Sequence, residues 1–264
     1  MIPLRDNIPT ARPPVVTYAI IIANVLVYFL WQRGGLTLGD PSSPHYLNNL
    51  IDYGAIPYEL THPGDNCEIV SQSGALACEG MRGVTGTAEP QPPTYVTPFT
   101  AMFMHGGLLH LGGNMLFLWI FGNNVEDSMG SVKFVFFYVL GGLAALLLQV
   151  IVGPNAVVPT IGASGAIAGV LGGYILLFPR AKVVTVIFII FFFTILELPA
   201  LLVLGFWFLE QAVMGYFDLA QPSGKGGGVA YFAHVGGFLF GLLAVRAFAS
   251  RQRMQRQTER FARR

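Results

Sequence analysis

The sequence predicts an all-α polytopic membrane protein with six transmembrane helices. Its composition points to this class, since 53% of the 264 residues are hydrophobic and only 11% are charged, whereas an ordinary soluble domain carries about 25% charged residues. The apolar residues also gather in runs near the length of about 20 residues that crosses a bilayer as a helix. The distribution of Lys and Arg along the chain supplies the third observation.

Six apolar runs are interpreted as spanning helices, and together they define a membrane domain over residues 15–249. In chain order they are residues 15–31, 107–129, 132–152, 162–178, 198–217 and 229–249. The alternative for the first run is a signal peptide. That alternative is weakened because residues 32–35 lack the small-residue pattern of a cleavage site.

The basic residues orient the chain with both termini in the cytoplasm. With the N-terminus inside, every Lys and Arg except Arg33, Arg82 and Lys225 lies on the inner side, as the positive-inside rule expects. This orientation predicts an inner tail at residues 1–14 and an Arg-rich inner tail at residues 250–264. It also places a long loop, residues 34–98, on the outer side, and we expect much of that loop to be irregular.

The outer loop contains both cysteines of the chain, Cys67 and Cys78. Outside the cytoplasm such a pair is typical of a disulfide, and two free thiols are the alternative. No pattern of metal ligands lies nearby. The sequence predicts neither a metal nor another cofactor.

The apolar segment 183–195 is not counted among the six spans. Glu197 and Pro199 follow it, and proline favours the first turn of a new helix. We therefore expect residues 183–195 to form an interfacial or folded-back segment before the span at 198–217. A single long kinked helix is the alternative.

Four polar residues are predicted to lie at one depth. In the orientation above, the second, fourth and sixth spans all run from the outer to the inner side. His110 and Asn114 lie near the start of the second span, Ser164 near the start of the fourth, and His234 near the start of the sixth. At 1.5 Å per residue, all four fall about 4–10 Å below the outer surface.

Small residues favour close contact between the helices that carry Ser164 and His234. Gly165, Gly169 and Gly173 recur every four residues on one helix, and Ala233, Gly237 and Gly241 do so on the other. Such small-xxx-small patterns permit two backbones to approach closely in lipid. Alone they indicate only packing.

Together these residues are typical of a serine nucleophile with a histidine base. A serine hydroxyl becomes reactive when a positioned His accepts its proton. Unused N–H groups at the start of the Ser164 helix, with His110 and the Asn114 amide, are suited to stabilising an oxyanion. No Asp or Glu lies at this depth to orient His234, which predicts a dyad. Individually, each residue also fits a packing or structural role, and a metal site is disfavoured because no carboxylate or thiol completes a ligand set.

The motifs His110-x-x-x-Asn114, Gly162-Ala163-Ser164-Gly165 and Ala233-His234-x-x-Gly237-x-x-x-Gly241 resemble the rhomboid family of intramembrane serine proteases. The resemblance covers residues 97–249. It implies Ser164 as nucleophile, His234 as general base, and His110 and Asn114 with the Ser164 N–H as the oxyanion hole. It also implies structural roles for His105 and Glu126. Some members carry a Tyr four residues after the serine to support the His ring, and here that residue is Ala168.

The resemblance implies a rhomboid-like fold and an intramembrane serine endopeptidase. Such an enzyme would cut transmembrane-anchored proteins near the outer face, at sites with small and helix-destabilising residues. Its partners would be these substrates and the lipid bilayer, with no nucleic acid and no metal. We expect it in the plasma membrane of a bacterium. A non-catalytic rhomboid-like binder of membrane proteins is the alternative, and a small transporter is a third reading.

Overall fold

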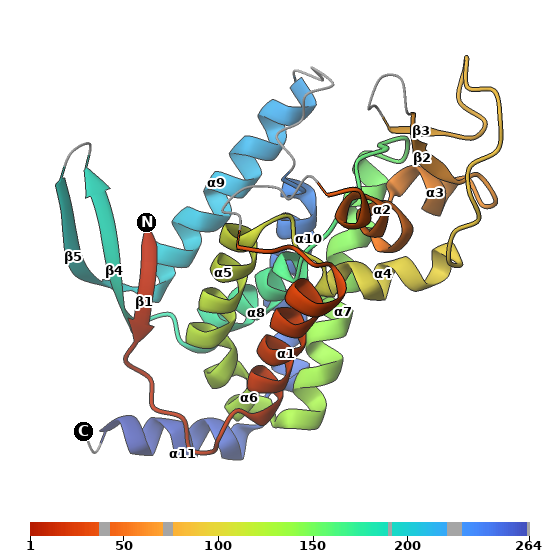
Figure 1. Ribbon diagram of the computed structural model, residues 1–264. Coiled ribbons are helices and arrows are strands. Elements are labelled where there is room, and N and C mark those ends of the chain that lie inside the picture. Colours follow the sequence, from red (N-terminus) through yellow and green to blue (C-terminus); the bar gives the residue numbers. More distant parts are fainter. Residues whose placement is uncertain (37–42, 71–75, 190–191, 221–228, 263–264) are drawn as a thin grey trace.

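The computed structural model describes residues 1–36, 43–70, 76–189, 192–220 and 229–262. Lys225, Arg263 and Arg264, which entered the orientation argument, lie outside these residues. The described chain is mostly helical, and its helices form a bundle (Figure 1).

The bundle is built around α8 (Ser164–Leu177), which is buried along nearly its whole length. α7 (Ser131–Val152) and α10 (Tyr231–Phe248) pack along it, and α9 (Ala200–Ala220) packs against α10 (Figure 1). α1 (Val15–Leu26) continues into a π-helical turn, η1 (Val27–Trp31). α5 (Leu108–Phe117) continues through a π-helical turn, η4 (Leu118–Gly122), into α6 (Asn123–Met129).

By length and composition, three helices of the described chain are long and apolar enough to cross a membrane. They are Ser131–Val152, Ala200–Leu219 and Tyr231–Phe248. Two shorter apolar helices, Val15–Trp31 and Ser164–Leu177, accompany them. The bounds of the helices differ from those of the six predicted apolar runs by at most three residues. Glycine, proline and polar residues interrupt the apolar runs at these bounds.

An antiparallel sheet corrects the all-α expectation. Its strands are β1 (Ile2–Asp6), β4 (Lys182–Ile189) and β5 (Phe192–Pro199), in the order β1-β4-β5. Segment 183–195 therefore does fold back, as a hairpin, and the alternative of one long kinked helix is wrong. The residues of β4 explain the strand, since Val183, Val184, Thr185, Val186 and Ile187 are all β-branched.

Residues 34–98, expected to be largely irregular, contain a folded unit. It comprises α2 (Pro44–Tyr53), α3 (Pro57–Thr61) and a hairpin of β2 (Cys67–Ile69) and β3 (Leu76–Cys78). Cys67 and Cys78 face each other across this hairpin and form a disulfide. The unit contacts the segment that leads to Ser164, because Ala55 and Thr160 exchange two backbone hydrogen bonds. After it come η2 (Thr94–Val96), α4 (Thr97–Thr100) and η3 (Ala101–Phe103).

This unit predicts a pH-dependent stability through Glu59. Burial raises the pKa of Glu59 from its ordinary 4.5 to about 7. The hydrogen bond from the Cys67 N–H lowers this pKa in part, and the charge of Asp52 raises it slightly. The folded chain thus holds this proton more tightly than the unfolded chain, so stability falls as pH rises from 4.5 to 7 by about 2–3 kcal/mol. Glu59→Gln keeps the acceptor and removes the charge. We expect the difference in melting temperature between Glu59→Gln and the wild type to increase from pH 5 to pH 8. A difference that stays constant would contradict the raised pKa of Glu59.

At the opposite end of the bundle, Glu126 joins three helices. It accepts hydrogen bonds from the Val16 N–H, from the Thr17 N–H and hydroxyl, and from the Ser131 hydroxyl, at 2.6–3.1 Å. The first turns of α1 and α7 thus meet at one carboxylate on α6. α11 (Arg251–Ala262) lies at this end of the bundle and contacts α6 (Figure 1).

Candidate active site

The starts of α5, α8 and α10 bring the predicted polar residues to one end of the bundle. His110 is the third residue of α5, Ser164 is the first of α8, and His234 is the fourth of α10. This is the end that faces the disulfide-bonded unit, since residues 153–162 connect to both. α5, α8 and α10 therefore begin at the same end of the bundle, as the sequence argument required (Figure 1).

The hydroxyl of Ser164 and the imidazole of His234 are in hydrogen-bonding contact. Ser164 Oγ lies 2.8 Å from His234 Nε2, although the two residues are 70 positions apart in the chain. At this distance the hydroxyl can donate its proton to a neutral ring nitrogen. The arrangement can therefore generate a serine nucleophile.

Direct backbone contact between α8 and α10 makes this distance possible. A Cβ placed on Gly237 would stand 2.0 Å from the Gly165 carbonyl oxygen, and one on Gly241 would stand 2.0 Å from that of Gly169. No side chain larger than hydrogen fits at either position without moving a helix. The predicted small-residue stripes thus form the interface between the two helices.

His110 borders the same region from α5. The Gly106 N–H donates to His110 Nδ1 at 3.2 Å, which leaves the proton of a neutral ring on Nε2. That Nε2 borders Gly162, where a Cβ would stand 2.8 Å from it and 3.5 Å from Ser164 Oγ. Gly162 has a φ of 114°, a conformation that favours glycine.

Asn114 presents a buried donor without an acceptor. Its side chain is 9% exposed, and its amide nitrogen has no hydrogen-bond partner among the described residues. Buried amide donors are nearly always bonded, and each exception calls for an explanation. A ligand oxygen that arrives during a reaction is one explanation.

His105 is held through its backbone. Its N–H donates to Gln32 Oε1 at 3.0 Å, and its carbonyl accepts the Tyr46 hydroxyl at 2.7 Å. The His105 ring packs edge-on against the His110 ring, with centroids 5.1 Å apart. This contact fits the structural role that the family resemblance implies.

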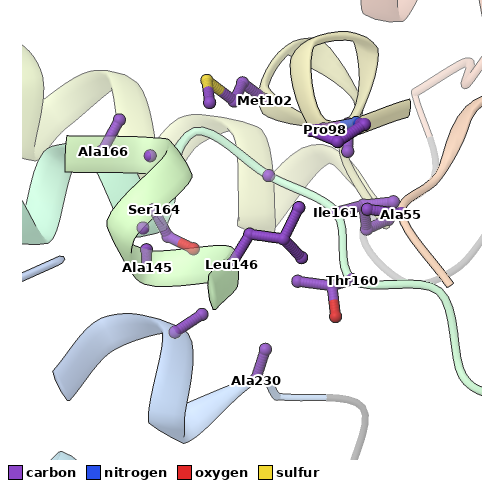
Figure 2. A pocket seen from close by; sticks show the side chains of 15 residues that line it. Ala55, Pro98, Met102, Ala145, Leu146, Thr160, Ile161, Ser164, Ala166 and Ala230 are labelled. Carbon is purple, nitrogen blue, oxygen red and sulfur yellow. The ribbon is translucent and has the colours of Figure 1, made fainter. Parts of the chain in front are cut away.

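A small pocket opens beside Ser164. Its volume is about 30 Å³, enough for a water molecule. Figure 2 shows this pocket, which lies between α4, η3, α7, α8, the start of α10 and the segments before α3 and α8. Most of its lining residues are small: Ala55, Ala101, Gly142, Ala145, Gly162, Gly165, Ala166, Ala230 and Ala233. A chemical group that approaches Ser164 through this pocket must be small.

Sequence reasoning missed two residues of α9 that contact His234. Gln211, on α9, places its Oε1 2.7 Å from His234 Nδ1. Trp207, one turn earlier on the same helix, lies against the imidazole with ring centroids 5.7 Å apart. The available signal was a glutamine within an apolar span, four residues after a tryptophan.

Comparisons with known proteins agree with these motifs. A family model described as "Rhomboid domain" matches residues 92–251. "Rhomboid protein 1, mitochondrial" of Saccharomyces cerevisiae is 33% identical over 145 residues, which are 53% of this chain and 38% of that protein. "Rhomboid protease GluP" of Bacillus subtilis is 31% identical over 160 residues, 60% of this chain and 24% of that protein. "Presenilin-associated rhomboid-like protein, mitochondrial" of Mus musculus is 26% identical over 167 residues, 59% of this chain and 39% of that protein.

The matched region spans less than two-fifths of the length of each of these relatives. The family model, in contrast, covers more than half of this chain and contains every motif residue of the site. Together with the long apolar helices, it makes the chain a multi-pass membrane protein. The chain belongs to the rhomboid family.

Proposed function

We propose that the chain is an intramembrane serine endopeptidase that cleaves transmembrane-anchored proteins. The observation that carries the proposal is the 2.8 Å contact between Ser164 Oγ and His234 Nε2. His234 takes the proton of the hydroxyl as Oγ attacks the scissile carbonyl, and later returns it to the leaving amine. A water then attacks the acyl-enzyme; His234 accepts a proton from the water and returns it to Ser164 Oγ as the acyl bond breaks.

Three donors would stabilise the oxyanion of the tetrahedral intermediate. The Asn114 amide is a buried donor with no partner in the described part of the chain. His110 directs an Nε2–H toward Gly162, because its Nδ1 accepts the Gly106 N–H. The Ser164 N–H lies at the first position of α8, where helical N–H groups have no intrahelical acceptor.

The membrane arrangement is part of the proposal. We assign six spanning helices with both termini in the cytoplasm, so that Ser164 lies near the outer face. The disulfide between Cys67 and Cys78 supports this side, because disulfides persist outside the reducing cytoplasm. The bacterial plasma membrane stays a prediction, since the relatives include mitochondrial proteins.

The pocket beside Ser164 favours substrates with a small residue at the cut. Its lining is mostly Ala and Gly, and a closely packed wall of this kind leaves little room for a bulky side chain. A substrate helix must also unwind locally, because a helical carbonyl is already hydrogen-bonded.

Cleavage of a model transmembrane substrate in proteoliposomes tests the proposal. Wild-type protein should yield one pair of products, with the cut mapped by mass spectrometry near the outer face. Ser164→Ala and His234→Ala should yield none. Capture of uncut substrate by the wild type would favour the non-catalytic binder, and cleavage by Ser164→Ala would remove the nucleophile assignment.

Asn114→Ala tests the oxyanion hole separately. Loss of one oxyanion donor should lower kcat about 10²-fold with little change in KM, because the bond forms only as the oxyanion develops. The measurement is steady-state cleavage of the same substrate by variant and wild type. An unchanged kcat would exclude the Asn114 amide from the reaction.

A further inference from the structure

The second nitrogen of the His234 ring is held by a side chain outside the family motifs. Gln211 is 8% exposed, and its Oε1 lies 2.7 Å from His234 Nδ1. The sequence predicted a dyad with no Asp or Glu to orient His234; Glu210, which precedes Gln211 on α9, is exposed. We infer that Gln211 is a positioning residue, which orients the imidazole and selects its tautomer; the inference rests on the proposed role of His234 as general base.

The hydrogen bond selects the tautomer that the reaction requires. A neutral imidazole carries one proton, and a carbonyl oxygen beside Nδ1 accepts that proton and keeps it there. Nε2 is then left with its lone pair, 2.8 Å from the Ser164 hydroxyl. If Nδ1 had no acceptor, the proton of the neutral ring could move to Nε2. Nε2 would then be a donor and could not accept the proton of the Ser164 hydroxyl.

α9 also supplies the ring contact that α8 lacks. Ala168 occupies the position at which some family members carry a supporting Tyr. It is fully buried, and its methyl group does not give the imidazole the ring contact that a Tyr would. Trp207 instead contacts His234 from α9, one turn before Gln211. Both supports of the imidazole thus come from one face of α9.

A glutamine suits this location better than the carboxylate of a soluble serine protease. An ionised Asp buried between membrane helices is costly, whereas a neutral amide that forms its hydrogen bond costs far less. The amide dipole still stabilises the protonated ring through the Nδ1–H bond, because its oxygen carries partial negative charge. Gln211 therefore provides orientation without a buried charge.

Two substitutions of nearly the same shape separate the hydrogen bond from packing. Gln211→Met fills the same space but has no strong acceptor, and Gln211→Glu keeps an oxygen at the same place. We expect kcat for the model substrate to fall about 10- to 100-fold in Gln211→Met with KM nearly unchanged. Gln211→Glu should recover most of that loss.

Gln149→Met is the matched control. Gln149 Oε1 accepts the backbone N–H of Ala233 at 3.1 Å. Gln149 therefore also bonds α10 next to His234, but through the backbone and not through the imidazole ring. Its replacement should lower the melting temperature about as much as Gln211→Met and change kcat less than about threefold. Equal losses of kcat in the two variants would overturn the positioning role.

Nitrogen-15 spectra of histidine-labelled protein read the tautomer directly, with or without turnover. Wild type should show His234 protonated at Nδ1, and Gln211→Met should lose that preference. An unchanged tautomer or an unchanged kcat in Gln211→Met would overturn the inference while leaving the dyad intact. Absence of cleavage by the wild type would count against the proposed function alone, because the spectra would still decide the role of Gln211.

Discussion

Gly237→Ala should lower the rate of substrate cleavage at least about 100-fold. The added Cβ would stand 2.0 Å from the Gly165 carbonyl oxygen, so α8 and α10 must separate by about 1 Å to restore normal contact. Gly237 lies three residues after His234, and a displacement of this size stretches the Ser164–His234 hydrogen bond beyond its useful range. A misplacement of about 1 Å is enough for such a loss.

Two further alanine substitutions serve as comparisons for Gly237→Ala. Gly241→Ala meets the Gly169 carbonyl oxygen at the same 2.0 Å but lies a turn further from His234, so we expect similar destabilisation and a smaller loss of rate. On α9, a Cβ on Gly205 meets nothing within 4 Å in the described chain, and Gly205→Ala should keep full activity. Full activity in Gly237→Ala would show that cleavage does not depend on the contact between α8 and α10.

Glu126→Ala should destabilise the protein by about 3–5 kcal/mol. The carboxylate accepts four hydrogen bonds that tie the first turns of α1 and α7 to α6. Bonds to a charged acceptor contribute about 1.5–3 kcal/mol each and are not additive, and the helix N-termini add a favourable dipole interaction. The measurement is the melting temperature in detergent, which we expect to fall by more than about 10 °C.

Glu68→Ala is the comparison for this prediction, since Glu68 is exposed on β2 and its replacement should change stability by less than about 0.5 kcal/mol. The stability of Glu126→Gln should lie between those of the wild type and Glu126→Ala. Its amide oxygen can still accept two of the four hydrogen bonds, whereas its amide nitrogen cannot accept the other two. If Glu126→Ala melts like Glu68→Ala, the carboxylate does not hold these helices together.

Helix direction and spacing were sufficient to predict which polar residues meet. Because spans alternate in direction, the starts of α5, α8 and α10 had to lie at one end, and residues near those starts had to share a level. The small-residue stripes likewise predicted that α8 and α10 touch. These are local patterns whose spatial consequence is nearly unique in a helical bundle.

The sheet was not predictable in the same way. A wholly apolar run such as 183–195 has no alternation to distinguish a strand from a buried helix. Its pairing with β1 joins Ile2 to Val186 across most of the chain, and no local pattern encodes such a distant partner. Within residues 34–98, Ser43 followed by Pro44 begins α2 with a serine cap, a signal that the surrounding prolines and glycines obscured.

Gln211 escaped prediction for a different reason. Its role depends on the angle at which α9 meets α10, and that angle follows from packing rather than from a motif. A lone glutamine in an apolar span more often bonds within the bundle interior than at a reactive group. Only its 2.7 Å contact with His234 Nδ1 distinguishes it.

Labelling with a serine-directed fluorophosphonate tests the central claim most directly. In detergent-solubilised wild-type protein, mass spectrometry of the labelled peptide should place the phosphonyl group on Ser164. Ser164→Ala should remain unlabelled, and His234→Ala should react at least about 100-fold more slowly, because its hydroxyl lacks a base. Equal labelling of wild type and Ser164→Ala would contradict the account.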